Sequence, residues 1–145
     1  MANSYNKVND FVEDVGTETH DFNSDTLTVA LSDTAPGSET NDPTADGNGV
    51  LSNVTEIDYT NCSSRDLTIS DWSVSSGVAK LTINDLTISA SGGDVGPFRY
   101  AYIYNDSAGS DELIGYYDYG SSTTLNDGDD FKIDFDDTNG VIQLS

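Results

Sequence analysis

The sequence predicts an all-β protein, an antiparallel β-sandwich or jelly-roll-like barrel with one short N-terminal helix. Apolar and polar residues alternate in most segments after residue 26, and Gly, Asn, Asp and Ser turn signals separate these segments at intervals of roughly eight to fifteen residues. No internal repeat is present. Since 145 residues are enough for one hydrophobic core, a single β-rich domain is expected over residues 1–145.

The segment 4–15 is predicted to form the short helix. Ser4 is a suitable N-cap and Gly16 a suitable stop signal. The apolar residues of the segment recur at or beside helical spacing: Tyr5, Val8, Phe11, Val12 and Val15. A helix of about ten residues is marginal alone, so its apolar side is expected to dock on the domain itself or on another chain.

A strand is predicted at 26–31, where Leu27, Val29 and Leu31 share one face. Residues 33–49 then lose all periodicity and carry proline and glycine among acidic and small polar residues, which indicates a long exposed acidic loop. Such a loop is usually functional or disordered. The main strands are expected within 50–145, the first of them at 50–60.

Two later segments, 67–74 and 79–90, alternate but switch parity midway, near Ser70-Asp71 and near Asn84-Asp85. A switch of parity requires an extra residue, so a β-bulge is predicted at each of these places, where it would bend the strand as a sandwich corner requires. The turn between the two segments is expected at Ser75-Ser76-Gly77.

The strand predicted at 98–104 has apolar side chains on both faces and is therefore expected to be central, paired as a hairpin with 113–119. Near the C-terminus, 131–135 alternates again. Asn139-Gly140 is a typical two-residue turn, which would place Phe135 opposite Leu144.

The chain carries 26 acidic and five basic residues, for a net charge of −21. Binding to nucleic acid requires a stripe of lysine and arginine, so neither nucleic acid nor an anionic membrane is expected as a partner. No apolar run is long enough to span a bilayer, and a secretory signal is not evident, so the product is expected to be soluble and made in the cytoplasm. The acidity suits either an outward-facing surface that DNA would repel or simple solubility.

Histidine and cysteine, on which many catalytic and metal sites depend, occur only once each. The single histidine, His20, is expected to be a loop residue bonded to backbone, and the single cysteine, Cys62, cannot form an intrachain disulfide. Asp42-x-Thr44-x-Asp46-Gly47 is similar to the opening of a calcium loop, but the twelfth position is Asn53, which lacks the required carboxylate. No catalytic residue, cofactor or metal site is therefore predicted, and the chain is not expected to be an enzyme.

Two patches carry a resemblance to a known family. The first is 92–124, from Ser-Gly-Gly-Asp-Val-Gly-Pro-Phe-Arg-Tyr to Gly-Ser-Ser-Thr-Thr; the second combines 6–13, 26–31 and 34–36. Together they cover about half of the chain. They resemble a family of small virion proteins from tailed double-stranded DNA phages, and the resemblance implies a place in the phage particle.

The resemblance and the charge together lead to the expectation of a capsid decoration, or cement, protein. Such a protein would bind the major capsid protein on the outer surface of the icosahedral head and clamp its subunits, by analogy as a homotrimer. The alternatives are a tail component (tube, adaptor or tip subunit) and a carbohydrate-binding module on the virion surface that uses Trp72 or tyrosines. The segments 4–15 and 33–49 are expected to touch the capsid or a neighbouring copy.

Individual contact residues are expected among the apolar side chains of the helix and the aromatic strand, because interfaces favour tyrosine and arginine. Arg99 is expected to pair with a carboxylate of its own chain in preference to one of a neighbouring subunit. The candidates are Tyr5, Val8, Phe11, Val12, Arg99, Tyr102 and Tyr104.

Overall fold

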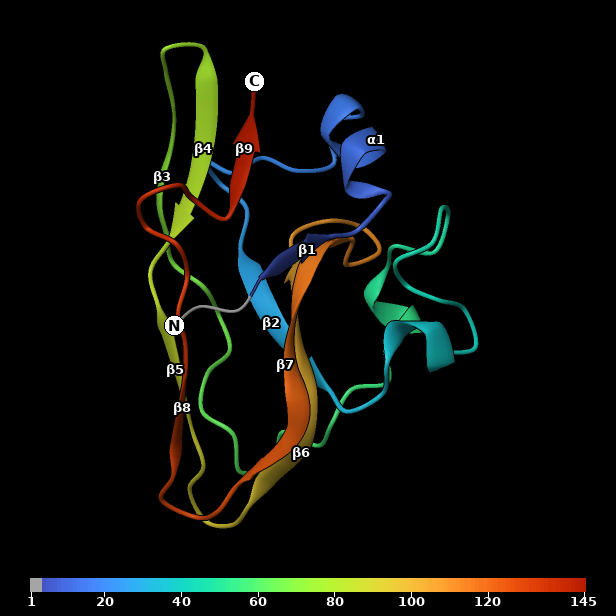
Figure 1. Ribbon diagram of the computed structural model, residues 1–145, viewed down its shortest axis with the longest axis vertical. Helices are drawn as coiled ribbons and strands as arrows, with labels where there is room; N and C mark the ends of the chain where they lie inside the picture. The colour runs from blue at the N-terminus through green and yellow to red at the C-terminus, as the bar shows by residue number, and fades with distance from the viewer. Residues whose placement is uncertain (1–3) are drawn as a thin grey trace.

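The computed structural model describes residues 4–145 and arranges them as layers of antiparallel strands (Figure 1). The all-β, sandwich-like prediction is confirmed. The helices and strands are β1 (Tyr5–Lys7), α1 (Phe11–Gly16), β2 (Leu27–Ser32), η1 (Pro36–Ser38), η2 (Leu51–Asn53), β3 (Ile69–Ser75), β4 (Val78–Ile83), β5 (Leu86–Ser89), β6 (Val95–Asn105), β7 (Leu113–Leu125), β8 (Asp130–Ile133) and β9 (Ile142–Leu144).

The middle layer is a four-stranded sheet in the order β1-β7-β6-β2. β6 and β7 form the predicted hairpin, with Tyr102 opposite Tyr116, and β2 pairs with the other side of β6, with Leu31 opposite Ala101. β6 is therefore central, as its apolar residues on both faces predict. Elements lie against both of its faces, which is why a strand with this composition is stable here.

The second layer contains the three-stranded sheet β3-β4-β9 and the β5-β8 pair, on one side of the middle sheet (Figure 1). β3 and β4 turn through Ser76 and Gly77, both at positive φ, and the predicted irregularity in β3 is present between Ile69 and Asp71. The bulge predicted at the second parity switch, near Asn84-Asp85, is absent. The chain leaves one sheet at the end of β4 and enters another at β5, so Asn84-Asp85 is a junction between sheets and not a bulge within one strand.

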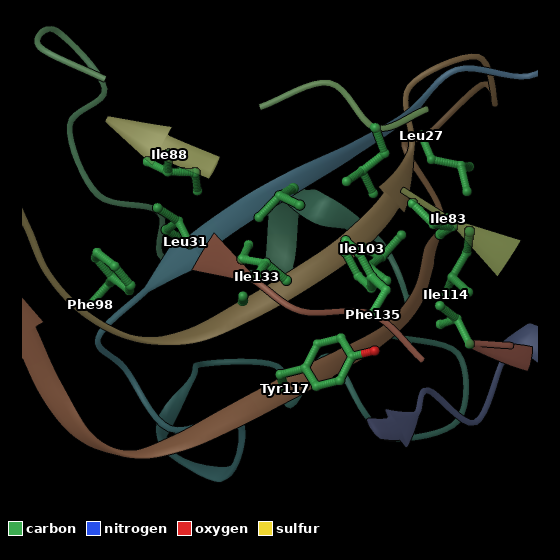
Figure 2. Close-up of a cluster of buried hydrophobic side chains, with 14 of the residues drawn as sticks. Leu27, Leu31, Ile83, Ile88, Phe98, Ile103, Ile114, Tyr117, Ile133 and Phe135 are labelled. Carbon is green, nitrogen blue, oxygen red and sulfur yellow. The ribbon is translucent and has the colours of Figure 1, made fainter. Parts of the chain in front are cut away.

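The main core lies between these two layers (Figure 2). Ile103 of β6 and Ile114 of β7 point into it from the middle sheet, and Ile133 of β8 meets them from the second layer. Each of the three is at most 1% exposed. Burying such a side chain contributes about 1.5–3 kcal/mol, so this cluster is the main source of stability.

A second cluster covers the opposite face of the middle sheet. Tyr102 and Leu113 are fully buried there beneath Val54, which the chain supplies after the loop at 33–49. Figure 1 shows this part of the chain, in teal and green, on the far side of the middle sheet from the second layer. The prediction of an exposed loop at 33–49 is therefore wrong in part, because the loop and the residues after it cover an apolar face, and Pro43 is buried.

The prediction of a helix over residues 4–15 is also wrong for the first half of that segment. Tyr5–Lys7 is the edge strand β1, and the helix is limited to Phe11–Gly16. The open edge of β7 explains the difference: Tyr5 pairs with Tyr117, and the Val8 amide donates to the Ile114 carbonyl at 3.1 Å. Backbone hydrogen bonds to an existing sheet stabilise a strand more than two isolated helical turns stabilise themselves.

Two further predictions differ from the structure. The strand predicted at 50–60 is absent: these residues form the short helix η2 and an irregular segment. Val54 packs on the second cluster and Ile57 on the main core, so the two side chains point to opposite sides, as they would in a strand. At the C-terminus, Phe135 does not face Leu144. β9 pairs with β4, so Leu144 lies opposite Ala79, and β8 pairs with β5.

Candidate contact surface

The helix α1 and the acidic loop are joined into one unit. The Asp10 carboxylate accepts hydrogen bonds from the backbone amides of Gly47 and Gly49, both at 2.8 Å, and the Asn9 side-chain amide donates to the Asp46 carboxylate at 3.0 Å. An added Cβ at Gly49 would lie 2.9 Å from Asp10, so the approach requires glycine. We refer to residues 9–13 and 42–49 as the helix–loop face. Its two parts lie within the segments 4–15 and 33–49, which are expected from the sequence to contact the capsid or a neighbouring copy.

An exposed valine lies on this face. Val12 is 64% exposed, while its neighbour Phe11 is 2% exposed and anchors the helix in the main core. The other large apolar side chain that is strongly exposed in the described chain is Val74 of β3, at 68%. A single exposed valine is ordinary on a protein surface, but here it lies on an anchored helix, where a partner would not have to order the backbone.

Most of the predicted contact residues lie inside the chain. Val8, Phe11, Tyr102 and Tyr104 are each at most 6% exposed, so their side chains are not available at the surface of this structure. Tyr5 is partly buried; its hydroxyl donates to the Ile114 carbonyl and its ring packs edge-on against Tyr117. The physical reason is that both faces of the middle sheet are covered by the chain itself, which alternation along one strand cannot reveal.

Arg99 forms the predicted intrachain pair. Its Nε and Nη2 donate to the two carboxylate oxygens of Asp118 on the neighbouring strand, at 2.7 and 2.9 Å. This two-pronged contact raises the pKa of Arg99 and lowers that of Asp118. Since the side chains are 37% and 34% exposed, the pair contributes little to stability and acts mainly to orient Arg99.

Other basic side chains are also engaged within the chain. The Arg65 guanidinium lies 3.6 Å from the centre of the Tyr59 ring, and Lys132 Nζ lies 2.7 Å from the Asp85 carboxylate. Lys80 Nζ donates to the Thr138 carbonyl at 3.1 Å. These cations are distributed over different parts of the fold, so they form no basic stripe in the described chain, and the surface field is dominated by carboxylates.

His20 belongs to a buried cluster that the sequence did not reveal. Its imidazole, 0% exposed, packs against both Phe11 and Phe22, with ring centres 5.6 and 5.8 Å away; the two phenyl rings also contact each other, with centres 6.3 Å apart. The prediction that His20 bonds to backbone is wrong. Its Nδ1 lies 3.0 Å from the Asn105 side-chain amide and accepts a hydrogen bond from it. His20 Nε2 lies 3.9 Å from the Asp14 carboxylate, and within the described residues neither atom of this pair has a hydrogen-bond partner.

Burial changes the protonation of this cluster. It lowers the pKa of His20, so the imidazole is neutral at pH 7. It also raises the pKa of Asp14 to about 6, helped by the nearby carboxylates of Glu112, Asp10 and Glu13. A perturbed pair can mark an active site, but the packing of His20 against two phenyl rings is typical of a core residue.

We expect Asp14→Asn to stabilise the protein at pH 8 and to have little effect at pH 3, below both the unfolded and the folded pKa of Asp14. An acid whose pKa is raised on folding favours the folded state when protonated, and this contribution is lost as pH rises from the unfolded value near 3.8 through about 6. The asparagine stays neutral throughout. Urea unfolding at both pH values measures the effect, with Glu18→Gln as the control, because Glu18 is exposed and is not one of the carboxylates that raise the Asp14 pKa. An equal gain at both pH values would contradict the assignment.

The acidic loop residues bond to the chain itself. The Asp42 carboxylate accepts hydrogen bonds from both the amide and the hydroxyl of Thr44, at 2.9 and 2.7 Å, and Asp46 is held by Asn9. Over residues 4–145, no group of three or more His, Cys, Asp or Glu side chains is arranged to hold a metal ion. The same residues include no helix long and apolar enough to cross a membrane.

Comparisons with protein-family models, with curated proteins and with solved structures found no match for this chain. The fold defines an all-β, sandwich-like protein.

Proposed function

We propose that this chain is a capsid decoration protein of a tailed phage, which binds the outer surface of the head and clamps major capsid subunits as a homotrimer. The sequence resemblance described above supports the phage context. The net charge of −21 supports an exterior position, because packaged DNA would repel such a surface. The proposed role is mechanical and requires no catalysis.

The observation that carries this proposal is the helix–loop face. Asp10 ties α1 to the loop through two backbone amides, and Phe11 fixes the helix in the core. Val12 is thus presented on a preorganised, largely acidic surface. Repeated at symmetry-related positions on a shell, even a modest contact of this kind would accumulate into strong attachment.

The test is cosedimentation of the purified protein with phage heads that lack it, followed by cryo-electron microscopy. We expect saturable binding at symmetry-related exterior sites. Val12→Asp is expected to weaken binding by about tenfold or more, because a carboxylate would lose its water at an apolar contact. Val74→Asp is the matched control, since Val74 is similarly exposed, at 68% against 64% for Val12, but lies on β3.

Both substitutions are on the surface, so circular dichroism should show an unchanged fold. Equal binding by Val12→Asp and the wild type would refute the helix–loop face as the contact. Binding to isolated tails and not to heads would replace the decoration role by that of a tail tube, adaptor or tip subunit. Light scattering of the free and head-bound protein tests the trimer.

A further inference from the structure

A groove lies beside the single tryptophan of the chain. It has a volume of about 460 Å³ and runs between residues 22–25 and residues 67–72, the latter leading into and including the start of β3. Trp72, which is partly buried, lines it. The Phe22 ring meets the indole edge-on with the ring centres 5.1 Å apart and so supports it from the core side. The volume is within the range of small-ligand sites, roughly 300–1,000 Å³.

The rest of the lining is polar. Asn23 and Thr68 are exposed, and their side chains make no hydrogen bond within the described chain, so the amide and the hydroxyl can both bind a ligand. Asp25 and Asp71 add carboxylates. One oxygen of each already accepts a hydrogen bond within the chain, from Asn105 and from Ser73, and the other oxygen can accept one from a ligand. No lysine or arginine of the described residues lines the groove, which disfavours phosphate and other anions.

A second hollow of about 400 Å³ shares an aromatic wall with the first, because Phe22 and Trp72 line both. Its other walls include Val15 and Leu144, so it is the less polar of the two. A ligand longer than one ring could extend from Trp72 along residues 22–25 and 67–71 of the first groove. None of the residues that line either hollow belongs to the helix–loop face as defined above.

We infer that the groove binds a neutral oligosaccharide. A sugar ring has a face of C–H groups that packs on the electron-rich face of an indole, while its hydroxyls both donate and accept hydrogen bonds. Trp72 supplies the aromatic surface, Asn23 and Thr68 supply mixed donors and acceptors, and the carboxylates accept from hydroxyls. This site is distinct from the proposed capsid contact, and it would give a head-bound protein a way to hold surface glycans.

The test uses Trp72 as its own reporter, because it is the only tryptophan in the chain. A printed array of neutral glycans identifies the preferred ones, and the tryptophan emission is then titrated with the best of them. We expect a saturable change in emission, with the oligosaccharide bound at least about tenfold more tightly than its monosaccharide. Charged comparators such as oligogalacturonate should bind more weakly, because Asp25 and Asp71 repel them.

The variants separate the groove from the rest of the surface. Thr68→Ala and Asn23→Ala keep the reporter and should each weaken binding by about threefold to tenfold, as expected for one lost hydrogen bond. Thr87→Ala is the matched control, since Thr87 is exposed on β5 away from the groove, and it should change nothing. Trp72→Phe, followed by calorimetry, should weaken binding by about tenfold while preserving the fold.

Two outcomes would overturn the inference: no saturable binding of any neutral glycan up to about 10 mM, or binding that Thr68→Ala, Asn23→Ala and Trp72→Phe all leave unchanged. A preference for anionic glycans would also overturn it. None of these results depends on phage heads, so failure of this inference is distinguishable from failure of the proposed capsid role.

Discussion

Phe11→Ala is expected to lower the free energy of unfolding by about 3–5 kcal/mol, the usual cost of removing a buried phenyl ring. Phe11 is 2% exposed and stacks with His20 and Phe22, with ring centres 5.6 and 6.3 Å away. Its loss would leave a cavity beneath α1 and remove one wall of the His20 site. The helix has only six residues, so it is not expected to stay formed without this anchor.

Val12→Ala is the control for this prediction, because it shortens the neighbouring side chain, which is 64% exposed. Its effect on unfolding should be within about 0.5 kcal/mol. Urea unfolding with m-values measures both variants. If the two cost the same, α1 would not be anchored through Phe11 and the helix–loop face would lack its proposed rigidity. Because Phe11→Ala also disturbs the helix, it should weaken head binding at concentrations where the protein remains folded.

Ile103→Ala is expected to cost about 2–5 kcal/mol, as is usual for a large aliphatic residue in a close-packed core. Ile103 is 1% exposed, lies near the C-terminal end of β6 and faces the main core between the layers (Figure 2). β6 holds β2 on one side and β7 on the other, so loosening its packing affects the whole middle sheet. Thermal and urea unfolding should both register the loss.

Tyr102, the residue before Ile103 in β6, is expected to respond differently to truncation. Tyr102 points to the opposite face of β6 and is fully buried, and its hydroxyl has no hydrogen-bond partner within the described residues. Tyr102→Phe removes a buried polar atom that pays a desolvation cost, so it should stabilise the protein by about 1 kcal/mol or leave it unchanged. A loss comparable to that of Ile103→Ala would mean that the hydroxyl is satisfied, for instance by water.

The candidate contact residues show how far sequence patterns reach. Helical spacing placed Tyr5, Val8, Phe11 and Val12 on or beside one predicted face, but the structure uses Tyr5 in a strand, buries Val8 and Phe11, and exposes Val12. The intrachain pairing of Arg99 could be predicted, because an arginine in so acidic a chain has many possible partners nearby. The groove at Trp72 and the His20 cluster could not be predicted, since each joins segments that are distant in sequence.

The sequence by itself determined the all-β class, the strand at Leu27–Ser32, the β6–β7 hairpin and the irregularity at Ile69–Asp71. Alternation, turn residues and parity are local properties, so they can be read along the chain. Only the tertiary structure decided that Tyr5–Lys7 is a strand, that β9 joins β4, and that residues after 33 cover the tyrosines. These choices depend on which edge or apolar face is left open by the rest of the fold, and that is a non-local competition between burial and backbone hydrogen bonding.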